Sequence, residues 1–279
     1  PMAVALLAAA VVIAGDVRAA WVAVFAGSFA AQCHLSFAAV GAVTVCASVG
    51  VVAVRVRRGD GLARRQLLVS AAVFVVCWLG PIVDQLFRHG NIGHLLTGGG
   101  TGVTLGWHES WSRFVKIVLP WRLLFDQHID TAELVASVGV WESLLASLLV
   151  VATIAAMRRR GGVARRVGVL LAVVVLAQIA ITAVMPVTMG TIFGLHLARA
   201  WWPVVFMVWV CAAFVLCAWL AERVQWRRSF SIAAVAVSGV AAIAGAVLYD
   251  ASDVRDGTWY EPTRDVSEAI ANLAPTGRY

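Results

Sequence analysis

The sequence predicts an all-α fold of the polytopic membrane class, with about eight membrane segments. Hydrophobic residues make up 61% of the 279 positions and charged residues only 13%, which is a composition outside the range of water-soluble domains. Several apolar runs approach or exceed the roughly 20 residues that a helix needs to cross a bilayer. The basic residues gather between these runs, a pattern that membrane topology explains better than nucleic-acid binding.

The apolar runs and their interruptions predict the segments in order. Residues 2–14 are too few for a full span, so we expect a span truncated at its start, in a fragment of a longer protein. Residues 20–54 would form one helix of about 50 Å, which is too long. We expect a break at Gln32–Ser36 and two short spans, 20–34 and 37–54. The later segments are 66–87, 131–156, 167–187, 201–221 and 229–249.

The distribution of charge predicts an orientation in the membrane. The turns at 15–19, 55–65, 157–166 and 222–228 hold 14 of the 22 basic residues but only three of the 15 acidic residues. Short loops rich in arginine are typically cytoplasmic. We therefore expect a multi-pass protein of the plasma membrane, with the basic loops cytoplasmic and the other loops and the C-terminal tail outside.

Two regions interrupt the apolar pattern on the predicted outer side. The loop 88–130 contains Trp107, Trp111, Phe114, Val115 and Val118 at helical spacing, which predicts an amphipathic helix over about 107–119 lying on the membrane surface. Glu109, Arg113 and Lys116 occupy its other side. The residues 1–249 thus form a transmembrane domain, and 250–279 form an extracytoplasmic tail that begins a soluble domain.

The candidate site lies at the outer end of segment 66–87. Pro81 kinks or ends a helix because it lacks an N–H, and Asp84 and Gln85 follow within one turn. Glu142 falls inside segment 131–156, where an acid is either functional or one half of a buried pair, with Gln178 as the candidate partner.

Short phrases in the chain resemble the GT-C superfamily, the integral-membrane glycosyltransferases of actinobacteria. These phrases are Ala26-Gly-Ser28 with Gln32-Cys-His-Leu-Ser36, Trp78-Leu-Gly-Pro-Ile-Val-Asp-Gln85 with Gly90-Asn-Ile-Gly93, and Ala200-Trp-Trp-Pro203. The resemblance covers most of 20–225. It implies transfer of a sugar from a polyprenyl-phosphate carrier to a glycan, lipid or protein acceptor at the outer face.

The resemblance also implies roles for particular residues. Asp84 and His34 are the expected catalytic residues, and a divalent metal ion is an optional cofactor that Asp84 would bind. Arg88 would contact the donor phosphate, and the remaining expected substrate-binding residues are Gln32, Gln85, Asn91 and Glu142. The superfamily usually carries its catalytic carboxylate in a first outward loop, and no outward loop before residue 34 contains an acid. The chain therefore resembles the middle and later spans of such an enzyme.

Two other classes of function stay open. A glutamate within a span and a helix broken by proline also fit a carrier or lipid flippase, although the chain shows no internal repeat. A non-catalytic scaffold subunit is the third option. Motifs of P-loop ATPases, zinc proteases and serine hydrolases do not occur in the sequence.

Overall fold

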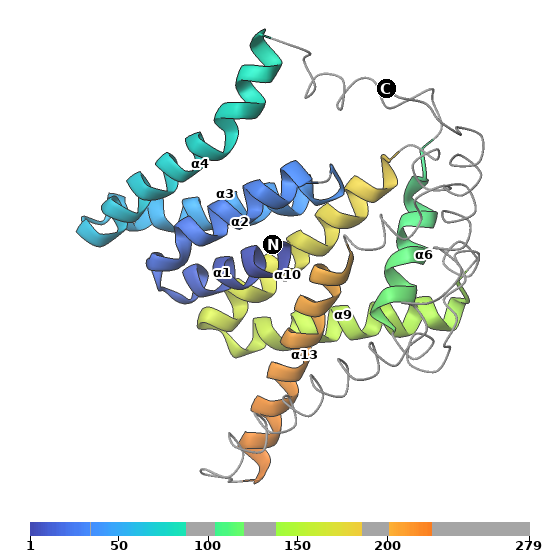
Figure 1. The fold of residues 1–279 in the computed structure, drawn as a ribbon. Helices are drawn as coiled ribbons and strands as arrows, with labels where there is room; N and C mark the ends of the chain where they lie inside the picture. The colour runs from blue at the N-terminus through green and yellow to red at the C-terminus, as the bar shows by residue number, and fades with distance from the viewer. Residues whose placement is uncertain (34, 88–103, 120–137, 186–200, 225–279) are drawn as a thin grey trace, which may run out of the picture. The chain divides into compact units, whose positions relative to one another are not determined.

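The computed structural model describes residues 1–279 with the exception of 34, 88–103, 120–137, 186–200 and 225–279 (Figure 1). Every regular element in the described part is a helix. The chain divides into two compact units, the first made of Pro1–Arg122 and Asp130–Trp219, and the second of Leu123–Ile129 and Leu220–Tyr279. All contacts discussed below lie within the first unit. The predicted segment 229–249 and the tail 250–279 lie outside the described residues.

The first three helices form the arrangement that the apolar runs predict. Helix α1 (Met2–Ala14) ends at Gly15, whose φ of 124° provides the turn into η1 (Val17–Ala19) and α2 (Ala20–Cys33). The long apolar run 20–54 is indeed broken, because η2 (Leu35–Phe37) separates α2 from α3 (Ala38–Arg57). Figure 1 shows α2 and α3 side by side. The predicted break at Gln32–Ser36 is confirmed.

Glycine sets the distance between α2 and α3. A Cβ atom added to Gly41 would lie 2.7 Å from the carbonyl oxygen of Gly27, and a Cβ on Gly27 would lie 3.1 Å from the side chain of Thr44. Such close approach is typical of helices that associate in membranes, where packing rather than the hydrophobic effect holds them together. The two short spans therefore pack as one hairpin.

Helix α4 (Gly61–Phe87) begins five residues before the predicted segment 66–87. Asp60 explains the early start, because its carboxylate Oδ1 accepts a hydrogen bond from the backbone N–H of Ala63 at 3.0 Å and caps the helix. This bond, followed by the charge of Arg55, lowers the pKa of Asp60 below its ordinary value of 3.8. Most side chains of α4 are exposed, as expected of a helix whose environment is lipid.

The later helices also extend into the turns where arginines were expected. Helix α9 (Val140–Arg160) contains the three consecutive arginines at its end, and α10 (Gly162–Ala183) starts two residues later. Gly161 and Gly162 have φ angles of 70° and 48°, so two glycines make the whole turn. Helix α13 (Trp201–Val224) matches the segment predicted from residue 201. The arginines at 158–160, 165 and 166 thus lie on helix ends, not in an extended loop.

Five of the described helices are long and apolar enough to cross a membrane, namely α3, α4, α9, α10 and α13. Two shorter apolar stretches, Met2–Ala14 and Val17–Cys33, accompany them. The protein is therefore a multi-pass membrane protein with a lipid bilayer as its environment, and its described part is helical. We call the end where α1, α3 and α9 finish the arginine-rich end, and the end where α2, α4 and α10 finish the arginine-poor end.

Candidate functional site

The kink-forming proline of α4 has a specific partner on α2. A residue at position 81 would normally donate its N–H to the carbonyl of residue 77, and proline has no N–H to donate. The side-chain amide nitrogen Nε2 of Gln32 donates to the carbonyl oxygen of Cys77 at 2.9 Å. Gln32 therefore satisfies the backbone acceptor that Pro81 leaves open, as membrane helices with internal prolines require.

Asp84 and Gln85 lie on the last turn and a half of α4, and both are half-buried and engaged in contacts. The helix continues through Pro81 to Phe87, so both side chains stand on regular helix at the arginine-poor end. The structure therefore positions these two predicted residues on a defined element. Three other predicted residues, His34, Arg88 and Asn91, lie outside the described residues.

Glu142 lies near the start of a candidate span that begins later than the predicted segment 131–156. The prediction put it inside a span 131–156, but α9 begins only at Val140, so Glu142 lies in the first helical turn. Its carboxylate Oε2 accepts a hydrogen bond from the backbone N–H of Gly139 at 3.0 Å. An acid in this position compensates a free N–H and the positive end of the helix dipole. Its location is that of a helix cap at the arginine-poor end.

The predicted amphipathic helix is present as α6 (Gly106–Val118), within one residue of the expected bounds. Its apolar side packs against protein: Phe114 is fully buried, with its ring centroid 5.2 Å from that of Trp201 on α13. Ser110 Oγ donates to the carbonyl of Ile179 on α10 at 2.7 Å. The apolar side of α6 is therefore covered by α10 and α13, and its position relative to the membrane surface stays a prediction.

The supposed polar side of α6 is also covered. Arg113 is only 5% exposed, and its Nε donates to Glu109 Oε1 at 2.9 Å. Its Nη1 nitrogen is buried with no hydrogen-bond partner among the described residues. A buried guanidinium N–H without an acceptor is energetically unfavourable and uncommon in native proteins. Arg113 is therefore a functional candidate that the sequence pattern did not reveal.

Two further buried polar atoms lie on the helices around α6. Gln178 of α10 is fully buried, and its Nε2 donates to Thr182 Oγ1 at 3.2 Å. Its Oε1, and the indole nitrogen Nε1 of Trp201, have no hydrogen-bond partner among the described residues. The acceptor of the Gln178 amide nitrogen is therefore Thr182, not the predicted partner Glu142. Gln178 Oε1 and Trp201 Nε1 are thus each a buried polar group without a hydrogen-bond partner among the described residues.

The expected divalent metal has no ligand set in the described part of the chain, where no three His, Cys, Asp or Glu side chains gather. Carboxylates and imidazoles are the side chains that most often bind such ions. Asp84 therefore belongs to no such group of three among the described residues.

No family model, no curated protein and no solved structure matches this chain.

Proposed function

We propose that this chain is the membrane part of a glycosyltransferase that uses a polyprenyl-phosphate-linked sugar at the arginine-poor end. The observation that supports this proposal most is the buried guanidinium of Arg113, with one N–H lacking an acceptor among the described residues. Guanidinium groups bind phosphate oxygens, like carboxylate oxygens, through strong charge-assisted hydrogen bonds, often two in parallel. The leaving group of the proposed reaction is such a phosphate.

Glu109 gives this arginine a fixed direction. Its carboxylate holds the Nε edge of Arg113 from one helical turn away, which leaves the Nη1 nitrogen for a ligand. A preformed donor needs little reorganisation when negative charge develops on the departing phosphate. Arg113 thus takes the role that the resemblance assigned to Arg88, or shares it with that residue.

Asp84 is the proposed general base in this reaction. A carboxylate takes the proton from the acceptor hydroxyl as that hydroxyl attacks the anomeric carbon of the sugar, while the bond to the lipid phosphate breaks. Asp84 stands on the helix that Gln32 braces through Cys77. With its nitrogen held by that carbonyl, Gln32 presents its amide oxygen in a set direction, suited to a sugar hydroxyl. Gln85 adds a second amide one residue after Asp84.

A carrier or flippase is the second candidate. That proposal depended on an acid within a span and on the proline in α4. Glu142 lies in the first turn of α9 as a cap, and the backbone acceptor left by Pro81 is satisfied by Gln32. Both features therefore have a structural role that requires no transported substrate.

The proposal can be tested with the full chain in native membranes. The probes are radiolabelled polyprenyl phosphate for binding and polyprenyl-phosphate-linked mannose or arabinose, labelled in the sugar, for transfer. We expect Arg113→Gln to weaken binding of the polyprenyl phosphate roughly 10- to 100-fold, the effect of losing a charge-assisted hydrogen bond. Asp84→Asn should abolish transfer and leave binding of polyprenyl phosphate intact.

The matched control is Arg165→Gln, which removes an exposed arginine at the opposite end of the molecule. It should leave binding and transfer unchanged, and Arg113→Lys should bind at an intermediate level if charge at this position is what matters. Unchanged binding in a folded Arg113→Gln variant would overturn the role of Arg113. Movement of the labelled lipid into vesicles that contain no acceptor, without sugar transfer, would favour the carrier.

A further inference from the structure

Two neighbouring cavities lie along one face of α3 at the arginine-rich end. The first, of about 620 Å³, is lined by Gly50, Val51, Val54, Arg58, Asp60 and Arg166, among others. The second, of about 420 Å³, is lined mainly by apolar side chains from α1, α3 and α10, including Val43, Ala47, Val169 and Val173. Arg166 of α10 lines both. The two cavities are therefore adjacent, one charged and one apolar, and we call them together the α3 groove.

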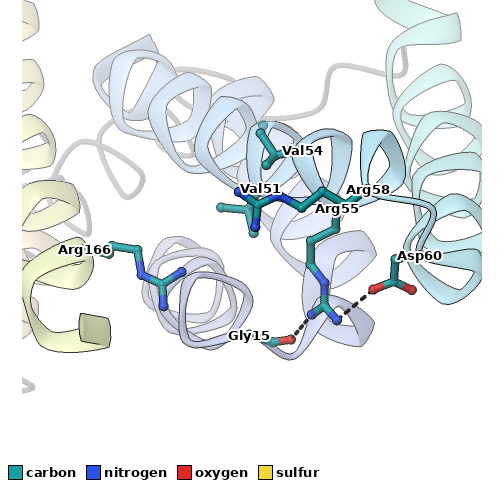
Figure 2. Close-up of a pocket in the computed structure, with 8 residues that line it drawn as sticks. Gly15, Val51, Val54, Arg55, Arg58, Asp60 and Arg166 are labelled. Carbon is teal, nitrogen blue, oxygen red and sulfur yellow. Dashed lines mark hydrogen bonds and ion pairs between the residues drawn. The ribbon is translucent and has the colours of Figure 1, made fainter.

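The charged part of the α3 groove contains two arginines that are not paired with an acid among the described residues. Arg55 is already neutralised, because its Nη2 lies 2.7 Å from Asp60 Oδ2 and its Nη1 donates to the carbonyl of Gly15. Arg58 and Arg166 reach toward each other from opposite sides of the cavity (Figure 2). Among the described residues, no acid pairs with either of them. The cavity thus carries excess positive charge from two guanidinium groups.

The whole α3 groove has the length of a lipid chain in one leaflet together with its headgroup. The residues that line the groove on α3 run from Val43 to Arg58, a distance of about 22 Å along a helix. A bilayer core is about 30 Å thick, so one leaflet accounts for about 15 Å and the headgroup region for the rest. Val169 and Val173 on the opposite wall are 50% and 43% exposed, which leaves apolar surface open for contact.

We propose that the α3 groove binds an anionic phospholipid, with its phosphate between Arg58 and Arg166 and one acyl chain against α3 and α10. Charge selects the headgroup, since basic side chains at a membrane surface attract anionic lipids. The apolar wall selects a lipid over a soluble phosphate. Arg55 and Asp60 act as a fixed support that holds the end of α3 against α1 and the start of α4. This site lies at the opposite end from the one proposed for sugar transfer.

The test is lipid retention by the purified full chain in nanodiscs, measured by native mass spectrometry with phosphatidylglycerol and phosphatidylcholine in competition. We expect the unaltered chain to retain phosphatidylglycerol selectively. Each basic residue near a membrane surface contributes about fivefold in affinity for an anionic lipid. The double variant Arg58→Gln/Arg166→Gln should therefore lose on the order of 25-fold in preference, whereas Arg64→Gln/Arg65→Gln, which removes equal charge outside the groove, should keep it.

A second variant distinguishes the contribution of the acyl chain to binding from that of the headgroup. Val169→Trp fills the apolar part without changing charge, and it should lower retention of phosphatidylglycerol while thermal stability stays unchanged. If both double arginine variants lost the preference for phosphatidylglycerol equally, the proposal would be overturned, because the lipid would then be attracted by overall charge and not by the groove. Displacement of the lipid by millimolar inorganic phosphate, or full retention in Val169→Trp, would also overturn it, because the ligand would then be a phosphate without a bound chain.

Discussion

The side chain of Gln32 and the backbone of Cys77 are joined by a hydrogen bond of 2.9 Å that depends on Pro81. Cys77 has a carbonyl without an intrahelical donor because residue 81 has no N–H. Such a bond connects α2 to the middle of α4, a helix with few other buried side chains. Asp84 and Gln85 at the end of α4 therefore owe their position partly to Gln32, which contacts a residue 45 positions later in the chain.

A double-mutant cycle tests this dependence. Gln32→Ala should lower the free energy of unfolding in detergent micelles by about 0.6 to 1.7 kcal/mol, the range for polar contacts between membrane helices. In a Pro81→Ala background the restored N–H of residue 81 satisfies Cys77, so the same substitution should have almost no effect. Equal losses in the two backgrounds, measured by denaturant titration, would show that Gln32 acts independently of the proline.

The close approach of Gly27 and Gly41 predicts a steric effect of a single methyl group. Gly41→Ala would place a Cβ 2.7 Å from the Gly27 carbonyl oxygen, so α2 and α3 must separate, at a cost of about 1 to 3 kcal/mol. Gly80→Ala is the control, because nothing lies within 4 Å of its Cβ, and alanine is favoured over glycine inside a helix by up to about 1 kcal/mol. Thermal unfolding should therefore shift in opposite directions for the two variants.

The packing of α6 gives a prediction that distinguishes a docked helix from one lying on lipid. Phe114→Ala should destabilise the protein by about 3 to 5 kcal/mol, since a fully buried ring is lost from the core. Trp107, which is 65% exposed, should tolerate alanine with a change within about 0.5 kcal/mol. If α6 were held by the membrane surface, Trp107→Ala would destabilise the protein more than Phe114→Ala. Unfolding of both variants can be followed by far-ultraviolet circular dichroism, a signal that does not depend on the tryptophan that is removed.

The sequence predicted the helices well and their ends less well. Apolar runs located α1, α3, α10 and α13, and the polar phrase at Gln32–Ser36 located the break between α2 and α3. The boundaries near arginines were wrong because long basic side chains stay in water while their backbone remains helical. Caps such as Asp60 and turns such as Gly161–Gly162 decide where those helices begin.

The candidate site was predictable only where it is local in sequence. Proline followed within one turn by Asp84 and Gln85 is visible as a pattern, and the structure places both on α4. The bond from Gln32 to Cys77 and the burial of Arg113 are tertiary facts. Periodicity assigned Arg113 to a solvated face, yet its neighbours Ser110 and Ser112 are small and also buried, so the other chain segments cover that face closely.

The lowered pKa of Asp60 predicts how the stability of the folded protein changes as pH falls. Its pKa in the folded protein is lowered below 3.8, first by the hydrogen bond from Ala63 and then by the charge of Arg55. A lowered folded pKa means that the stabilisation is present in full above about pH 4 and is lost as pH falls through the folded value. We therefore expect the melting temperature of the unaltered protein to fall below pH 4 more steeply than that of Asp60→Asn. The asparagine variant keeps the cap but does not titrate, so parallel acid profiles in a melting series from pH 6 to pH 2 would contradict the assignment.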